Sequence, residues 1–223
     1  MSGLLYRLRG GLAMQLEDAF EVPLPVAEAW GVLTDIERIT PYLPGIWLLE
    51  VGTDEYLGVV KVKIGPVTVW YEGVARYLLL DAAAYRAVLK AEGGEIRGQA
   101  NGTALVTASL SPSPTGTRVE VVTVLSIDGK LAQFAGDTLA FVSRSLIAEF
   151  AENLEFSVLA APRAFVARRA EKVHTVSSDL GVTKRGWESA KRRLAPMLAI
   201  AAILLGRQIV VHWLRLRWRA AVG

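Results

Sequence analysis

Residues 129–154 read GKLAQFAGDTLAFVSRSLIAEFAENL, and the rest of the fold follows from this stretch. Apolar side chains recur in it in steps of three and four, which is the repeat of an α-helix. The stripe consists of Leu131, Ala135, Leu139, Val142, Leu146, Phe150 and Leu154, and Phe134 and Phe141 widen it. We therefore predict one long amphipathic helix over 129–154, in which the only glycine is Gly136. Such a helix needs a sheet to cover its apolar face.

The residues that precede this helix alternate between apolar and polar with the period of two that is typical of strands. Strands are predicted at 15–22, 46–52, 56–64, 66–80, 83–93, 102–111 and 117–127. Two short helices, at 26–35 and 36–42, separate the first strand from the others. This order predicts an α+β helix-grip fold, in which a curved antiparallel sheet of about seven strands wraps around the long helix.

The same alternation assigns a face to each strand residue. Many positions predicted to face the helix are small, namely Gly73, Ala75, Ala87, Ala91, Ala104 and Ala108. Small residues under a long helix leave space, and an apolar space with a few hydroxyl groups suits a lipophilic ligand that has a polar head. Its predicted lining is Val69, Tyr71, Tyr77, Tyr85, Leu89, Val106, Thr123, Leu125, Phe134, Leu139, Phe141, Val142, Leu146 and Phe150. The alternative is that the large helix residues fill this space.

The opposite face of the predicted sheet is unusually apolar. Apolar side chains occupy positions where solvated strands carry charge: Val59, Trp70, Val74, Leu78, Val88, Leu105, Val122 and Val124. A contiguous apolar patch indicates a partner. We expect this outer face to be a docking surface or an oligomer contact, or to be covered by the N-terminal arm or the C-terminal tail.

The residue inventory excludes several kinds of chemistry. The chain has no cysteine, and its two histidines, His174 and His212, lie outside the strand-rich region. That region therefore has no thiol nucleophile, no thiolate metal site and no histidine-based site. A cyclase or hydrolase would need an acid–base pair among the inward residues, and the predicted inward positions supply none. We predict no catalytic residues and no metal site, and a protein that is not an enzyme.

The C-terminal part is basic and then strongly apolar. We divide the chain into an arm (1–13), a ligand domain (14–157), a basic linker (158–193) and a membrane-associating tail (194–223). Between residues 159 and 193 nine Lys or Arg stand against three acids, beside the apolar run LAPMLAIAAILLG at 194–206. This placement favours an anionic membrane surface over nucleic acid.

The tail predicts membrane contact through Met197, Ile200, Ile203, Leu204, Trp213, Arg215 and Trp218. The apolar run is shorter than the roughly 20 residues that a bilayer core requires, so we favour an in-plane helix over a spanning one. Either form would hold the protein at the cytoplasmic side of the cell membrane, as a peripheral or tail-anchored protein. The alternatives are a helix that packs on the domain itself or an oligomer contact.

Several motifs, in this order, resemble one family. They are LTDIERITPYLPGI, VKVKIGPVTVWYEGVARYLLLD, GGEIRGQANGTALVTASL and the 129–154 stretch, and together they span about residues 14–157. The chain resembles the carbon monoxide dehydrogenase G-subunit family, which belongs to the START-like (SRPBCC) helix-grip superfamily. The N-terminal arm and the apolar residues at Trp70, Val74, Val122 and Val124 depart from the family's pattern.

The resemblance implies a non-enzymatic accessory protein that recruits a molybdenum-containing dehydrogenase to the membrane and handles a quinone of the menaquinone or ubiquinone type. Related proteins occur beside other molybdenum hydroxylases, so carbon monoxide need not be the substrate. We expect a carrier of a quinone or similar isoprenoid lipid, with Tyr71, Tyr77, Tyr85 and Thr123 as candidate hydrogen-bond partners. The alternatives are a scaffold with a filled core and, less favoured, a cyclase- or hydrolase-like enzyme.

Overall fold

The computed structural model describes residues 5–8, 11–134 and 136–159. The strands are β1 (Leu5–Leu8), β2 (Gly11–Val22), β3 (Ile46–Val51), β4 (Tyr56–Ile64), β5 (Val67–Asp81), β6 (Arg86–Glu95), β7 (Asn101–Ser113) and β8 (Gly116–Ile127). The helices are α1 (Val26–Leu33), α2 (Ile36–Ile39), η1 (Thr40–Tyr42), η2 (Gly129–Phe134) and α3 (Asp137–Leu159). The predicted basic linker and membrane tail lie outside the described residues, apart from residues 158 and 159 at the end of α3.

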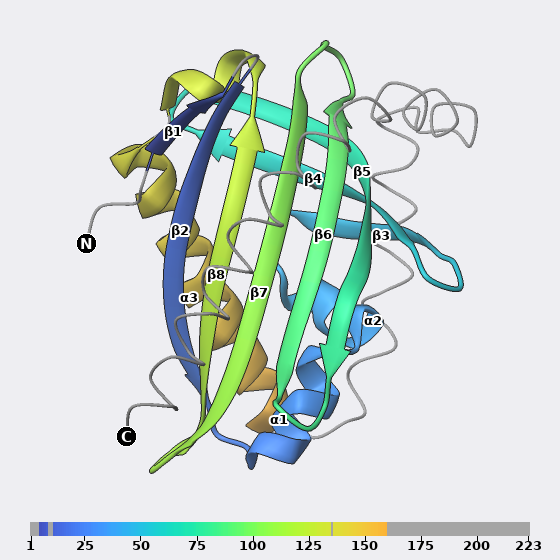
Figure 1. Cartoon of the computed structure of the whole chain (residues 1–223), viewed down its shortest axis with the longest axis vertical. Coiled ribbons are helices and arrows are strands. Elements are labelled where there is room, and N and C mark those ends of the chain that lie inside the picture. The colour runs from blue at the N-terminus through green and yellow to red at the C-terminus, as the bar shows by residue number, and fades with distance from the viewer. Residues whose placement is uncertain (1–4, 9–10, 135, 160–223) are drawn as a thin grey trace, which may run out of the picture. The chain divides into compact units, whose positions relative to one another are not determined.

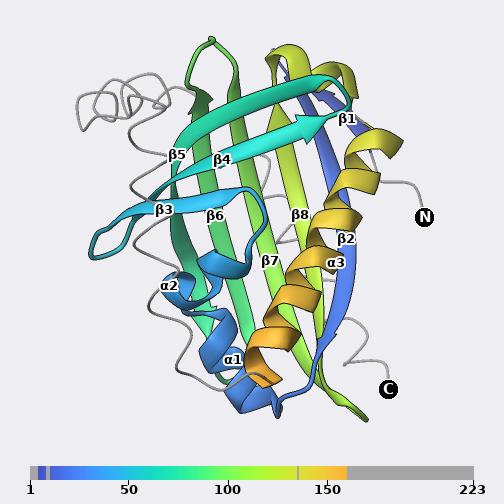
Figure 2. The ribbon, with the colours of Figure 1, turned by 180° about the vertical axis from the view of Figure 1, so that it is seen from behind.

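The described strands form one antiparallel sheet in the order β1-β2-β8-β7-β6-β5-β4-β3 (Figure 1). Each hairpin-connected strand from β3 to β8 lies beside the next, and β2 then pairs with β8. Helix α3 lies on the concave side of the sheet, where it packs mainly on β2 (Figure 2). This is the predicted α+β helix-grip fold, with β1 as an additional strand.

The sheet begins earlier in the chain than the alternation predicts. Strand β2 starts at Gly11 rather than at residue 15, and its Leu12 pairs with Ile127 of β8. Strand β1 pairs with β2 from Leu5↔Met14 to Leu8↔Gly11. Residues 5–8 and 11–13 of the predicted arm therefore belong to the sheet.

The prediction of one continuous helix over 129–154 is wrong at its N-terminal end. Residues 129–134 form the 3₁₀ helix η2, and α3 begins only at Asp137. Between them Gly136 has φ +92°, a left-handed conformation that an α-helix of L-residues cannot contain. The apolar repeat in the sequence continues across this break, because both helical segments turn their apolar residues toward the same sheet.

A row of glycines allows the sheet to bend. Gly58, Gly73, Gly93 and Gly102 pair with one another in register across β4, β5, β6 and β7. A Cβ atom at Gly73 would stand 2.2 Å from the carbonyl oxygen of Glu92 and 2.7 Å from the Cα of Gly93. Only glycine allows the two backbones to approach so closely. Strands β4 and β5 then curl over the concave side (Figure 2).

The buried side chains form two separate groups. The α1-side cluster consists of Val22, Ala29, Val32, Ile39, Leu110, Val119, Val121, Phe150 and Leu154. The η2-side cluster consists of Met14, Leu16, Ile64, Val69, Tyr71, Ile127, Leu131 and Leu139. Helix α3 contributes to both, with Leu139 near its start and with Phe150 and Leu154 near its end. The interior of the fold thus has a core at each end.

Candidate functional site

The concave face between the two clusters carries small residues, as the alternation predicts. Ala75, Ala91 and Ala104 pair directly across β5, β6 and β7. The next register row along the same face is Tyr77, Leu89, Val106 and Thr123. We call six of these residues the middle band: Ala75, Tyr77, Leu89, Ala91, Ala104 and Thr123. All six retain partial solvent exposure, and none is a member of either cluster.

Helix α3 has a gap in its buried stripe between the two clusters. Leu139 and Phe150 are 6% and 4% exposed, whereas Leu146 is 40% exposed. Leu146 precedes Phe150 by four residues and therefore lies on the same face of the helix. Leu146 is therefore not packed in either cluster. Val142, one turn earlier, is half-buried at the margin of the η2-side cluster.

The prediction that Phe141 lines the ligand space is wrong. Its side chain is 64% exposed, and it lies nine residues, or two and a half helical turns, before Phe150. It therefore points to the opposite side of α3 from the sheet. Phe134 does lie inward, against the η2-side cluster. Phe141 therefore cannot help to fill the middle of the interior, which was the alternative to a ligand space.

The remaining predicted lining residues lie at the two ends of the interior. Val69 is buried in the η2-side cluster, and Leu125 packs against it. Val106 packs against the α1-side cluster. The structure therefore places these residues beside the middle band and in contact with the cores that close it.

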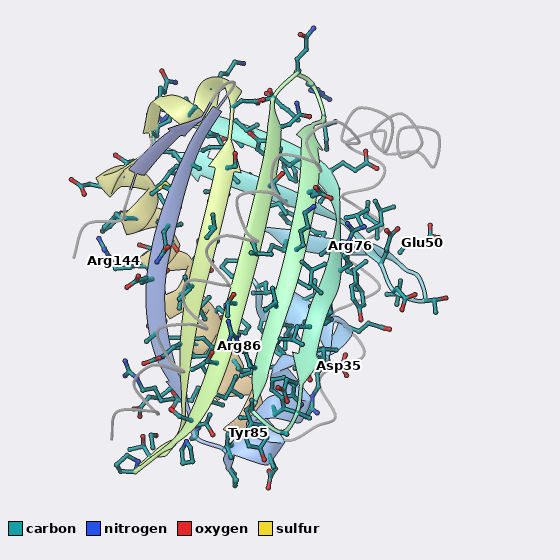
Figure 3. The ribbon with its side chains drawn as sticks, in the orientation of Figure 1. Asp35, Glu50, Arg76, Tyr85, Arg86 and Arg144 are labelled. Carbon is teal, nitrogen blue, oxygen red and sulfur yellow. The ribbon has the colours of Figure 1, made fainter. Side chains whose placement is uncertain are left out.

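Two of the predicted tyrosines are already engaged. The Tyr77 hydroxyl donates a hydrogen bond to the carbonyl oxygen of Thr34 at 3.2 Å, and burial, then Tyr56 and Asp35, raise the Tyr77 pKa. Tyr85 lies in the β5–β6 turn with φ +48°, and its ring meets that of Trp30 edge-on at 6.0 Å. Figure 3 shows Tyr85 at the end of the molecule near α1. Both residues secure α1 and the segment after it against the sheet.

Tyr71 differs from the other predicted tyrosines. It is 9% exposed, and its hydroxyl oxygen is buried with no hydrogen-bond partner among the described residues. Its ring reaches across β6, because Cε1 lies 3.9 Å from the position that a Cβ of Gly102 on β7 would occupy. Burial, then the negative charges of Glu95 and Asp128, raise the pKa of Tyr71 to about 12. The hydroxyl therefore keeps its proton and remains a donor.

Sequence reasoning missed two carboxylates on the concave side. Asp18 pairs with Val121 of the α1-side cluster, and it accepts a hydrogen bond of 2.6 Å from the Ser143 hydroxyl of α3. Glu95 pairs directly with Tyr71. The faces of the first strand were not assigned from the sequence, and Glu95 lies beyond the predicted end of its strand. The Asp18–Ser143 hydrogen bond links the first half of α3 to β2.

Burial on the convex face departs from the alternation at β4. Val59, predicted to face outward, is fully buried, whereas Val60, predicted to face inward, is 37% exposed. Val59 pairs with Trp47, whose ring stacks on Trp70 with centroids 5.4 Å apart. Val59 thus lies on the same face of the sheet as these two rings, which is the face that the alternation predicts.

The described residues contain no group of acidic or histidine side chains that could hold a metal ion. Within this same part of the chain, no helix combines the length and the apolar character needed to cross a bilayer. The predicted membrane residues of the tail, from Met197 to Trp218, lie outside it.

The curved sheet, the two helices inserted after the first long strand and the C-terminal α3 define a helix-grip protein. Residues 19–159 match the family model of the carbon monoxide dehydrogenase G subunit (CoxG). The match spans more than half of the chain, and the chain therefore belongs to this family. This family is an accessory-subunit family.

Similarity to a solved structure supports the fold. A conserved protein from Geobacillus kaustophilus is 19% identical with a TM-score of 0.53, and the alignment covers 66% of this chain and 95% of that one. Two further structures are similar at lower scores. A Thermus thermophilus protein is 15% identical with a TM-score of 0.49, covering 66% and 97%. An aromatase/cyclase from a Streptomyces species is 15% identical with a TM-score of 0.43, covering 65% and 93%. No curated protein matches the chain.

Proposed function

We propose that the protein binds a quinone or a similar isoprenoid lipid beneath α3 and links a molybdenum-containing dehydrogenase to the membrane. One observation carries the ligand part of this proposal: between the two packed cores, side chains of the middle band stay partly exposed and Leu146 of α3 is 40% exposed. A fold that needed only a filled core would place larger side chains than alanine at positions 75, 91 and 104. The family membership supports the dehydrogenase as the partner.

Solubility supplies the physical reason for such a carrier. Each isoprene unit in water costs roughly 3–4 kcal/mol, from about 0.8 kcal/mol for each buried carbon group. A water-soluble dehydrogenase therefore cannot meet a long-chain quinone by diffusion through water. The sheet side of this region has the small residues Ala75, Ala91 and Ala104, and the helix side has Val142 and Leu146, a surface that suits a hydrocarbon chain. The predicted tail would keep this domain close to the bilayer.

The direct test is the content of the purified protein. The full chain is isolated from membranes, its lipids are extracted, and quinones are identified by mass spectrometry. Lipid-stripped protein is then titrated with a soluble short-chain quinone. We expect co-purified quinone and saturable binding at one site per chain. If both are absent, the carrier role is rejected and a scaffold with an empty middle band remains.

Membrane linkage is tested separately by flotation of the full chain with vesicles that contain anionic lipid. Replacement of Trp213 and Trp218 by alanine should reduce the floated fraction, because tryptophan side chains favour the membrane interface. An Ala substitution of the exposed Phe156 on α3 serves as the control outside the tail. Equal flotation of the tail variant and the wild type would contradict the predicted attachment.

A further inference from the structure

We infer that the Tyr71 hydroxyl binds the polar head of the ligand and that this head is an uncharged hydrogen-bond acceptor, such as a quinone carbonyl. This inference rests on the proposed function and specifies how the ligand is oriented. Its head would lie at the η2-side cluster, and its apolar chain would extend over the middle band toward the α1-side cluster.

The first support is the position of the Tyr71 ring. Tyr71 lies on β5 and pairs with Val60 of β4 and Glu95 of β6. Its Cε1 atom nevertheless approaches the Cβ position of Gly102 on β7 at 3.9 Å. This is ordinary van der Waals distance, so the ring crosses β6 and ends beside the backbone of β7. The phenol therefore lies over the concave face and not over its own strand alone.

The second support is the unsatisfied hydroxyl. Its oxygen is buried, and no described residue accepts or donates a hydrogen bond to it. Native interiors rarely leave a buried hydroxyl group without a partner, so such a group requires an explanation. The Tyr77 hydroxyl, in contrast, is already bonded to Thr34. Tyr71 therefore has an unused donor at the end of the interior, where a ligand acceptor would satisfy it.

The third support is the charge around the hydroxyl. Glu95 is the sheet partner of Tyr71, and Asp128 follows β8 and accepts a hydrogen bond of 2.5 Å from the Asn101 backbone N–H. Both carboxylates act electrostatically on the phenol. Negative charge close to the hydroxyl disfavours an anionic head, such as a fatty-acid carboxylate or a phosphate. A neutral carbonyl can accept from Tyr71 without this repulsion.

The experiment compares Tyr71→Phe with Tyr85→Phe in the full, lipid-stripped chain. The probes are decylubiquinone, decylbenzene (which has no carbonyl) and palmitate. We expect Tyr71→Phe to weaken decylubiquinone binding about tenfold, which corresponds to the loss of one hydrogen bond. Its affinity for decylbenzene should remain unchanged. Tyr85→Phe should leave decylubiquinone affinity within about twofold of wild type, because Tyr85 lies in the β5–β6 turn against Trp30, outside the middle band.

The outcomes separate the two claims. Unchanged decylubiquinone affinity in Tyr71→Phe would overturn the role of this hydroxyl, while binding by the wild type would leave the carrier role intact. Tighter binding of palmitate than of decylubiquinone would overturn the uncharged head. If Tyr71→Phe lost affinity for decylubiquinone and for decylbenzene equally, the substitution would have disrupted the site in general, and the inference would be overturned as well. Absence of saturable binding to the wild type would reject the proposed function itself.

Discussion

Replacement of Ala104 by leucine would test whether the interior between the two clusters is open. Ala104 lies in the middle band, paired with Ala91 and Leu125, and it is partly exposed. The matched control is Ala29→Leu, because Ala29 of α1 is 0% exposed within the α1-side cluster. Both substitutions add the same three carbon atoms, so the difference between them reports the space at each position.

The two substitutions should change the free energy of unfolding in opposite directions. In open space, three added carbons gain at most about 2 kcal/mol at about 0.8 kcal/mol for each buried carbon group. The leucine at 104 would be only partly covered, so we expect its free energy of unfolding to lie between that of wild type and about 2 kcal/mol above it. Overpacking a filled core costs about 1–3 kcal/mol or more, which is the expectation for Ala29→Leu.

The assay is urea denaturation of the full, lipid-stripped chain in mild detergent, followed by titration with decylubiquinone. Ala104→Leu should preserve stability and weaken quinone binding, because the new side chain occupies the place of the ligand chain. A loss of stability as large as that of Ala29→Leu would refute the reasoning, since it would mean that the middle band is already packed. Unimpaired quinone binding by a stable Ala104→Leu protein would place the ligand elsewhere.

Three further predictions concern stability. In the same denaturation assay, Leu146→Ala should lower the free energy of unfolding by less than about 1 kcal/mol. Leu154→Ala removes a side chain that is 1% exposed and should lower it by about 2–5 kcal/mol. Equal losses of stability would contradict an unfilled space below Leu146. Gly136→Ala should lower the free energy of unfolding by only about 1–2 kcal/mol, because its φ is left-handed but no atom lies near its Cβ position. Gly73→Ala should be far more destabilising, because its Cβ would collide with backbone atoms. Similar losses of stability in the two variants would argue against the close approach of the strands at Gly73. Above about pH 10, unfolded chains release the Tyr71 proton while folded chains retain it to about pH 12, so the free energy of unfolding should fall as the pH rises through this window; Tyr71→Phe should lose this part of the pH dependence, and an unchanged profile would refute the buried phenol.

Local sequence patterns were sufficient to predict the architecture, because the periods of two and of 3.6 are imposed by local backbone geometry. The strands from β3 to β8 and the α3 stripe of Leu139, Phe150 and Leu154 follow directly from that alternation. The small inward residues, such as Ala91 and Ala104, were equally visible. Side-chain size is a property of the sequence, and strand register conserves the face on which it appears.

Features that depend on contacts between distant segments became visible only in the folded chain. The left-handed Gly136 ends the apparent continuity of the helix, and the outward direction of Phe141 follows from where α3 then lies. Hydrogen bonding also separated the tyrosines: Tyr77 reaches Thr34, and Tyr71 finds no partner among the described residues. Periodicity predicts on which face of its own helix or strand a side chain lies. Which atoms that face contacts is decided only when distant elements pack together.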